Sequence, residues 1–538
     1  MGASESQTFD YVIIGGGTAG CILANRLSES GRHTVAMLEA GGEARSPWTT
    51  IPAGFYKLIT DPRYNWKFHT APEAGTKMRQ ITVPRGKGLG GSTLINGMIY
   101  VRGQPQDYDR WAQLGATGWG WADVEPVFRR IETYAGPDPD GLRGRSGPLP
   151  VGLVTERPEI SEAFIRAGEA AGFARNPDYN GASQDGFGYY QVNQQGGKRI
   201  SAAIAWLKPA RGRANLTVLT GAMATELTFD GARATGVKLR MGGTGREISA
   251  RREVILAAGA VQSPQLLELS GIGDPAVLAA AGVPLRFANP HVGENYIDHF
   301  CTRVNWRVKD ALTLNQSSRG LRLVGEVMKY ALNRTGILTY GTGLAHGFVR
   351  TREGLAGPDV QYFFMHASYA NAADRKMERE PGMTLGVTQL RPESRGSIHI
   401  GSPDPMVQPE IRPNFLDAAE DRRVMVEGMK IGRRVIESAP LDRYRVHEIE
   451  PGPDCRSDED WLEFARRNGQ TIYHVLGTCR MGREGQSVVD PGLRVHGIEG
   501  LRVVDASVMP DMVSGHSQAA VMMLADEGAD MILAAQGG

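Results

Sequence analysis

The feature that most constrains the fold is a glycine cluster placed directly after an apolar, strand-like run. Residues 9–14 (Phe-Asp-Tyr-Val-Ile-Ile) lead into 15–20 (Gly-Gly-Gly-Thr-Ala-Gly), and Glu39 follows a second apolar run. In a strand–turn–helix unit the first glycine permits the tight turn and the second lets the backbone approach a pyrophosphate. The third lets the helix pack on the strand, and a later carboxylate binds a ribose hydroxyl. Glycine clusters also form ordinary turns, but this context predicts a strand over 9–14, a helix over 18–28 and a strand over 34–38, which together bind a dinucleotide.

Length, charge and cysteine content exclude several classes of protein. The chain has 538 residues, too many for one ordinary core, so two or more domains are expected. Its 60 basic and 59 acidic residues form no long run of either sign, so neither nucleic acid nor an anionic membrane surface is an expected partner. The most apolar stretch, 519–535, contains three carboxylates, so no transmembrane segment is expected. The 4 cysteines are scattered, which predicts neither a disulfide framework nor a metal site.

The first residues show no secretory signal, because they lack a basic start and an apolar core. They match the MGxxxS myristoylation pattern through Gly2 and Ser6, a match short enough to arise by chance. We therefore predict a cytoplasmic protein.

Two further apolar strands end where a bound dinucleotide would lie. One spans 253–260, and the other spans 501–506 and is closed by Asp505. Ligands of open α/β sheets bind at the carboxyl ends of the strands, so both ends are candidate contacts. Ser263 and Pro264 after the first strand predict a helix start, with a hydroxyl cap and proline at the first position. A sheet built from such distant segments requires other material to be inserted between them.

The inserted material has a different pattern. Strand-like runs at 360–366 and 396–400 precede a segment with helical periodicity at 420–438. Strands followed by a helix favour an antiparallel sheet with helices on one face. We interpret this material as an α+β substrate domain beside an α/β Rossmann-like domain. The predicted division assigns 1–155, 200–305 and 480–538 to the dinucleotide-binding domain, and 156–199 and 306–479 to the substrate domain.

Three separate stretches resemble the glucose-methanol-choline (GMC) oxidoreductases, which carry FAD. The stretch 86–109, beginning Gly-Lys-Gly-Leu-Gly-Gly-Ser-Thr, is similar to the family's first signature, and 259–273 is similar to the second. The segment 474–482 (His-Val-Leu-Gly-Thr-Cys-Arg-Met-Gly) resembles the C-terminal active-site segment. With the N-terminal glycines and Asp505, the matches follow the family's order over almost the whole chain. The resemblance implies the GMC fold, an FAD-binding Rossmann-like domain with a second domain on an antiparallel sheet.

The resemblance also implies which residues bind FAD. In the family, the segment at Gly90 and Gly91 lies along the pyrophosphate and isoalloxazine, and the region after Gly259 lies near the adenosine. Some relatives attach FAD through a histidine in the first loop, whereas this chain has Ile95 there, so non-covalent FAD is expected. Ala224 stands at the family's usual adenine-side backbone contact. The expected FAD-binding residues are Gly15, Gly17, Thr18, Ala19, Gly20, Glu39, Ala40, Arg85, Gly90, Gly91, Ser92, Asn96, Gly97, Met98, Ala224, Gly259, Asp505, Ala506, His516, Ser517 and Gln518.

Two histidines, His474 and His516, lie in segments similar to the family's active site. In relatives these positions hold a His–His or His–Asn pair on the substrate face of the flavin. Alcohol oxidation moves a hydride to flavin N5 and a proton to a base. An imidazole with an ordinary pKa near ~6.5 accepts that proton, and a second imidazole can hold the alcohol oxygen. We predict His474 as the base and His516 as its partner, and the reverse assignment stays open.

Several neighbouring residues refine this prediction. Val475 follows His474 where many relatives have proline, so the backbone entering His474 is less defined. His346 and His366 in the inserted domain are expected to pack inside it. No carboxylate cage for a quaternary ammonium can be located, so choline is not favoured. The aromatic residues expected to form an apolar pocket are Tyr64, Trp66, Tyr362, Phe363, Phe364 and Tyr473.

The leading prediction is FAD-dependent oxidation of a primary alcohol, aromatic or aliphatic, to an aldehyde, with oxygen or another electron acceptor as co-substrate. A lyase or other non-redox activity on the same scaffold is the alternative, since the family includes hydroxynitrile lyases. An NAD-linked dehydrogenase and a non-catalytic flavin-binding protein are further alternative functions. The sequence does not distinguish the acceptors.

Overall fold

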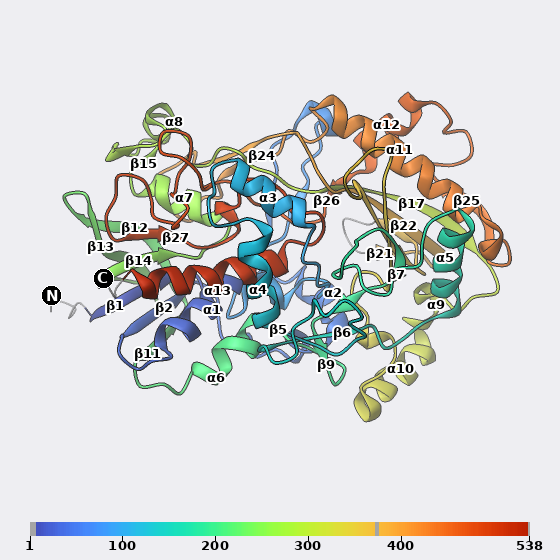
Figure 1. The fold of residues 1–538 in the computed structure, drawn as a ribbon, viewed down its shortest axis with the longest axis horizontal. Helices are drawn as coiled ribbons and strands as arrows, with labels where there is room; N and C mark the ends of the chain where they lie inside the picture. The colour runs from blue at the N-terminus through green and yellow to red at the C-terminus, as the bar shows by residue number, and fades with distance from the viewer. Residues whose placement is uncertain (1–6, 372–375, 536–538) are drawn as a thin grey trace.

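The structure is a computed structural model that describes residues 7–371 and 376–535. Two large sheets organise it (Figure 1), one near the two chain ends and one on the opposite side of the molecule.

The first sheet combines a parallel core with an antiparallel extension. Its strand order is β11 (Leu216–Thr220), β2 (Val35–Glu39), β1 (Gln7–Ile14), β14 (Thr244–Leu256), β13 (Arg233–Met241) and β12 (Ala222–Asp230), and β27 (Leu501–Val503) also pairs with β14. The pairs β11–β2, β2–β1, β1–β14 and β14–β27 are parallel. Residues 11–14 are buried, as expected for a parallel sheet covered on both faces. The distant apolar segments therefore assemble into one sheet, as predicted.

Helices cover this sheet and bring the chain's C-terminal part onto its N-terminal unit. The helix α1 (Thr18–Ser28) begins and ends where the glycine pattern predicts, and α13 (Gln518–Ala534) packs against it. The helix α4 (Trp121–Ile131) packs on α13 in turn. Arg26 of α1 and Arg130 of α4 both pair with Asp526 and Asp530 of α13. Figure 1 shows α13 crossing this half of the molecule beside α1.

The second sheet is antiparallel throughout. Its order is β25 (Arg445–Glu450), β17 (Phe300–Val308), β22 (Gly382–Gln389), β19 (Val360–Met365), β18 (Ala345–Val349) and β7 (Gly186–Tyr189), and β26 (Gln470–Thr471) also pairs with β17. The helices α5 (Glu159–Ala170) and α11 (Ala419–Ile436) pack against its strands and against each other. The predicted α+β unit on an antiparallel sheet is confirmed.

The predicted domain boundaries remain a proposal, and one of them needs a change. The boundary at residue 305 falls inside β17, which runs unbroken through Phe300–Val308 in the second sheet. A strand hydrogen-bonded along its length belongs to one sheet, so we place this boundary before Phe300.

The remaining helices and short strands connect or flank these two units. The helices are α2 (Phe55–Leu58), α3 (Pro105–Gln113), α6 (Lys208–Ala210), α7 (Gln262–Leu269), α8 (Pro275–Ala281), α9 (Leu314–Ser317), α10 (Gly320–Asn333) and α12 (Asp458–Asn468). The short strands are β3 (Phe68–His69), β4 (Thr82–Val83), β5 (Glu132–Tyr134), β6 (Leu149–Leu153), β8 (Gln191–Val192), β9 (Gln194–Gln195), β10 (Lys198–Arg199), β15 (Ile272–Gly273), β16 (Phe287–Ala288), β20 (Tyr369–Asn371), β21 (Lys376–Met377), β23 (Ser397–His399) and β24 (Glu410–Arg412).

Candidate active site

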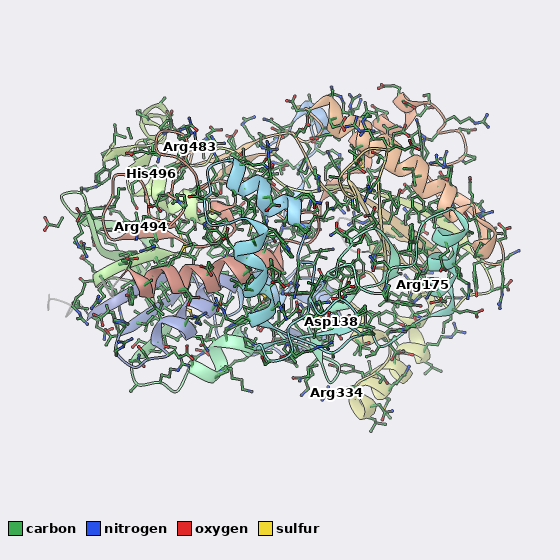
Figure 2. All side chains as sticks on the ribbon, in the orientation of Figure 1. Asp138, Arg175, Arg334, Arg483, Arg494 and His496 are labelled. Carbon is green, nitrogen blue, oxygen red and sulfur yellow. The ribbon has the colours of Figure 1, made fainter. Side chains whose placement is uncertain are left out.

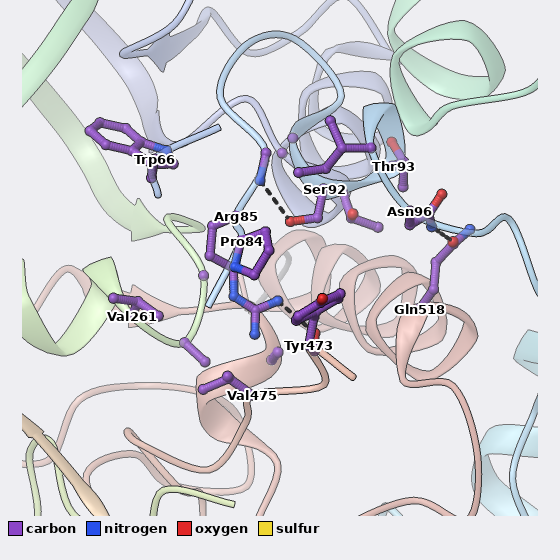
Figure 3. Close-up of a pocket in the computed structure, with 18 of the residues that line it drawn as sticks. Trp66, Pro84, Arg85, Ser92, Thr93, Asn96, Val261, Tyr473, Val475 and Gln518 are labelled. Carbon is purple, nitrogen blue, oxygen red and sulfur yellow. Dashed lines mark hydrogen bonds between the residues drawn. The ribbon is translucent and has the colours of Figure 1, made fainter. Parts of the chain in front are cut away.

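A cavity of about 300 Å³ lies between the two sheets. Its walls include the carboxyl ends of β1, β2 and β14 from the first sheet, and residues of β17, β19 and β22 from the second. Figure 3 shows part of this lining, with Arg85, Val261 and Tyr473 from segments far apart in the chain. The position matches the expected ligand site of an open α/β sheet.

Every predicted cofactor-binding or catalytic residue lines this cavity except Gly20 and Gly90. A Cβ on Gly20 would lie 1.8 Å from the carbonyl oxygen of Gly15, so Gly20 is needed for packing of α1 on the strand. Gly90 has a φ of 103° and donates its N–H to the Gly16 oxygen at 2.8 Å. These two glycines shape the neighbouring loops, and their assignment as FAD contacts stays a prediction.

Glu39 holds the loops on either side of the cavity. Its Oε2 accepts the Gly16 N–H at 2.8 Å, and its Oε1 accepts the N–H groups of Gly41 at 2.7 Å and Gly88 at 2.9 Å. A carboxylate offers about four lone-pair positions. Glu39 also lines the cavity, so one acceptor position is left for a ribose hydroxyl, and we propose that it binds there.

Asp505 joins the ends of β14 and β27. Its Oδ2 accepts the Gly259 N–H at 2.8 Å and the Ser263 hydroxyl at 2.5 Å, and its Oδ1 accepts the Ser507 N–H at 2.8 Å. The prediction that Ser263 caps a helix was therefore wrong. The helix α7 starts at Gln262, and the Ser263 hydroxyl is engaged by the carboxylate instead.

The backbone around the cavity fits a dinucleotide. Gly17 precedes α1, and no side chain of the described residues hydrogen-bonds to this helix N-terminus as a cap. Helix N-termini bind phosphate through their free N–H groups. A Cβ on Gly259 would meet no atom within 4 Å, and one on Gly17 would meet only Gly91 at 3.9 Å, so the space before both glycines is open. These residues can hold the pyrophosphate and adenosine parts of FAD.

The predicted histidine pair is formed. His474 follows β26 and His516 lies just before α13, and their rings are 4.8 Å apart at an interplanar angle of 74°. Burial lowers the pKa of His516 to about 3. The pKa of His474 is also well below its ordinary value, through burial first and then the charges of His516, His299 and Arg85. Both rings are therefore neutral at physiological pH.

A third histidine, His299, fixes the tautomer of His474. The Nδ1 atoms of the two rings are 2.9 Å apart, and His299 Nε2 lies 3.0 Å from the Leu390 carbonyl oxygen. Burial lowers the pKa of His299 to about 4, so this ring is neutral too. Because a carbonyl only accepts, His299 Nε2 carries the hydrogen, and its Nδ1 accepts from His474 Nδ1–H. His474 Nε2 is then left unprotonated, which is the state that a general base requires.

Polar groups hold the backbone at His474, which Val475 follows. Its N–H donates to Asp298 Oδ1 at 2.8 Å. Tyr473, with a left-handed φ of 75°, donates its N–H to the Thr471 hydroxyl at 2.7 Å, and its carbonyl accepts from Arg85 Nη1 at 2.8 Å. The Thr471 hydroxyl donates in turn to Asp298. This network defines the backbone around His474 without a proline.

Arg85 lines the cavity with unsatisfied donors. The side chain is half-buried, and its Nε and Nη2 are buried atoms with no hydrogen-bond partner among the described residues. Burial lowers the pKa of this guanidinium, and the Asp298 charge opposes that shift. A buried donor without a partner costs about 1–3 kcal/mol, so an acceptor on a bound ligand would stabilise this side chain. The polar edge of a flavin supplies such acceptors.

The substrate side of the cavity is aromatic, although only part of the predicted set contributes. Trp66, Phe363 and Tyr473 line it. Tyr362 and Phe364 alternate with Phe363 along β19 and pack in the core of the second unit on the other face of the sheet. Tyr64 packs outside the cavity against a small cluster that contains Leu58, Leu94 and Ile95. The lining aromatic residues that the sequence analysis did not single out are Phe55 and Tyr369.

The sequence analysis also missed His299 and Asp298. The only sequence signal is their position directly before the apolar run of β17, and this position does not identify a partner for His474. Among the described residues that line the cavity, the only carboxylates are Glu39 and Asp505, both engaged by backbone N–H groups, and the arginines are Arg85 and Arg303.

Comparison with known proteins assigns the family. GMC oxidoreductase family models match residues 9–301 and 392–525. An alcohol dehydrogenase (acceptor) from Pseudomonas putida is 39% identical over 531 residues, which are 98% of this chain and 96% of that protein. An oxygen-dependent choline dehydrogenase from Photobacterium profundum is 38% identical over 533 residues, 98% of this chain and 93% of the relative.

Solved structures agree with this result. Pyridoxine 4-oxidase from Mesorbium loti superposes with a TM-score of 0.88 at 31% identity, over 97% of this chain and 98% of that chain. Formate oxidase superposes with a TM-score of 0.91 at 28% identity, over 99% and 100% of the two chains. The chain therefore belongs to the GMC oxidoreductase family and is an FAD-dependent flavoenzyme that acts on CH–OH donors.

Proposed function

We propose that this enzyme oxidises a primary alcohol to an aldehyde, with His474 as the general base. The observation that carries the proposal is the hydrogen-bond chain from the Leu390 carbonyl through His299 to His474, which leaves His474 Nε2 unprotonated beside the cavity. A base in this state can accept the hydroxyl proton of a bound alcohol.

His516 completes the site as a hydrogen-bonding partner. Its ring lies against that of His474, and it is neutral, so one nitrogen donates and the other accepts. A donor to the alcohol oxygen stabilises the negative charge that develops there as the proton leaves. Bound FAD supplies the hydride acceptor for such an oxidation. The protein's contribution is to hold the carbon, the base and the oxygen-binding donor in one geometry.

The cavity favours a neutral alcohol with an apolar body. Trp66, Phe363 and Tyr473 offer apolar and aromatic contact. The carboxylates among the described lining residues, Glu39 and Asp505, lie at strand ends of the first sheet and accept backbone N–H groups there. The two arginines that line the cavity repel a cationic substrate. We therefore propose an aromatic or aliphatic primary alcohol over choline, although named relatives include choline dehydrogenases.

Three finer expectations remain part of the proposal. Ile95, in the loop where some relatives have a histidine, supports non-covalent FAD. The electron acceptor, oxygen or another compound, depends on access to the flavin edge and stays open. A cytoplasmic location stays a prediction from the sequence. A lyase activity on this scaffold is the alternative, and the histidine arrangement alone is compatible with it.

Anaerobic mixing of the enzyme with a panel of primary alcohols tests the proposal. Substrates should bleach the visible absorbance of the flavin, and readmitted air measures reaction with oxygen. His474→Ala should remain yellow but lose about 10²–10⁴-fold in bleaching rate, the usual contribution of a general base. His447→Ala, which changes an exposed histidine on β25, is the matched control and should behave like the wild type.

Two outcomes would contradict the proposal. Unchanged bleaching in His474→Ala would remove this residue from the base role. Absence of bleaching by any alcohol, together with cleavage of a hydroxynitrile, would favour the lyase.

A further inference from the structure

The helix α10 projects from the substrate-side unit and leaves its apolar side chains uncovered. It spans Gly320–Asn333 and lies at the edge of the molecule (Figure 1). Leu321 is 90% exposed and Leu332 is 75% exposed, and Tyr330 is the one fully buried residue of the helix. The exposed apolar side chains of α10 are Leu321, Leu323, Val324, Val327, Met328 and Leu332. Scattered exposed leucines are ordinary, but a contiguous apolar patch marks an interaction surface.

These residues form one continuous face. At 100° per residue, Leu321, Val324, Met328 and Leu332 share a stripe, and Leu323 and Val327 widen it on one side. Arg322 and Lys329 lie together beyond the other border of the stripe. The helix is therefore amphipathic with its apolar face turned outward, the reverse of a helix that packs its apolar face on a core.

The opposite side of α10 is firmly attached to the protein. The Tyr330 hydroxyl donates to the Gly197 oxygen at 3.0 Å. Glu326 Oε2 accepts the Ile337 N–H at 2.9 Å, and Lys329 lies 3.8 Å from Glu156. These contacts fix which face looks outward, so the exposure of the apolar stripe is a property of the fold.

Basic residues border this apolar face and lie at both ends of the helix. From residue 319 to residue 334 the chain carries four basic residues, Arg319, Arg322, Lys329 and Arg334, and one acidic residue, Glu326, which is engaged by the Ile337 N–H. Figure 2 shows Arg334 at the α10 edge of the molecule. The chain as a whole has a formal net charge of +1, so its composition does not indicate this local excess of basic residues. The expectation that no anionic membrane surface would be a partner rested on that overall balance and on the absence of a long run of like charges.

We propose that α10 binds the surface of a bilayer containing anionic phospholipids, with its apolar face in the headgroup and acyl boundary. An amphipathic helix flanked by lysine and arginine binds such an interface through both apolar burial and charge. No helix among residues 7–371 and 376–535 combines the length and apolar character needed to span a bilayer, so the association is peripheral. A symmetric dimer through α10 is less favourable, because a two-fold interface would bring the same basic residues of both copies together.

The proposed contact also orients the cavity. The chain runs from α10 into the turn Ile337–Thr339 and on to Thr342, which lines the cavity. That turn packs against the turn Pro52–Gly54, which precedes the cavity residue Phe55. The bilayer would therefore lie on the side of the molecule where these turns join the cavity wall. This geometry holds whatever alcohol the enzyme oxidises.

Vesicle co-sedimentation of the FAD-loaded, full-length enzyme tests the proposal. We expect binding to vesicles of phosphatidylglycerol mixed with phosphatidylcholine, weaker binding to pure phosphatidylcholine, and loss of the difference at high salt. The double variant Leu321→Gln/Met328→Gln should bind about tenfold more weakly to both vesicles. Arg322→Gln should lose about fivefold on anionic vesicles and little on neutral ones.

The matched control is Met406→Gln/Val407→Gln, which changes an exposed apolar pair outside α10 and should bind vesicles like the wild type. All variants alter exposed side chains, and bleaching by the alcohol substrate reports that each is folded. Absence of wild-type binding, or equal binding by the α10 double variant, would overturn the proposal. A wild-type dimer that this variant converts to a monomer, without vesicle binding, would assign the face to self-association instead.

Discussion

The proton on the His474 ring is positioned by a residue outside the cavity lining. His299 receives the Nδ1–H of His474 and is itself oriented by the Leu390 carbonyl. Without an acceptor at this point, His474 could place its proton on either nitrogen, and only one of the two tautomers can act as a base toward the cavity. His299 is therefore a positioning residue for the proposed reaction.

We predict that His299→Leu slows anaerobic flavin bleaching by roughly 5- to 150-fold, which corresponds to the ~1–3 kcal/mol of a buried hydrogen-bond partner left unsatisfied. His299→Asn should recover most of the rate, because its Oδ1 can accept from His474 Nδ1–H. Stopped-flow absorbance measures both variants. If the two variants are equally slow with unchanged melting temperatures, the acceptor at this position does not set the rate.

At the scale of secondary-structure elements, the close contact of α1 with β1 positions the dinucleotide loop. The Cβ that an alanine at residue 20 would add falls 1.8 Å from the Gly15 oxygen, which is an impossible contact. The helix must then move away from the loop that it presents to the ligand. We predict that Gly20→Ala destabilises the fold by about 1–3 kcal/mol, as overpacking does, and lowers FAD content.

Thermal unfolding and the ratio of flavin to protein absorbance check this prediction. Gly42→Ala is the matched control, because a Cβ on Gly42 meets no atom within 4 Å and its φ is not positive. Full FAD content and wild-type stability in Gly20→Ala would show that the contact can relax, and would refute the packing role.

The elements that the sequence predicted well are those whose pattern is local. The unit of β1, α1 and β2 follows from apolar runs and glycine placement, and the predicted helix 420–438 corresponds to α11. Contacts between distant segments were not predictable in this way. Ser263 has the composition of a helix cap, but its hydroxyl is engaged by Asp505, which comes from the far end of the chain.

The same distinction applies to the candidate site. His474 and His516 were found because each lies in a motif, whereas His299 lies in none and meets His474 only through the pairing of β17 with β26. The strand β19 contains three consecutive aromatic residues, and the sequence alone does not show which face of the sheet each of them occupies. In the structure only Phe363 of the three lines the cavity.

At the scale of the whole molecule, burial of neutral histidines makes stability depend on pH. Burial lowers the pKa of His346 to about 3 and that of His366 to about 4, against an ordinary value of 6.5 in the unfolded chain. Between those values the unfolded state binds protons that the folded state does not. Stability therefore falls as pH decreases from 6.5 towards 3, and these groups add no pH dependence above 6.5.

His346 isolates this effect because it lies away from the cavity lining. Its ring is fully buried among Tyr179, Tyr190 and Phe348, and neither ring nitrogen has a partner among the described residues. His346→Phe keeps an aromatic ring there and removes the titration. We predict that the variant gains stability relative to the wild type as pH falls below 6.5, with a slope of about one proton, and that the difference is constant above 6.5.

Thermal or urea unfolding from acidic to neutral pH measures the difference. The sign is decisive, because a histidine that gained a proton on folding would give the opposite trend. A difference between wild type and His346→Phe that does not change with pH would mean that His346 takes up its proton equally in both states. The conclusion that His346 is buried and uncharged beside the second sheet would then be wrong.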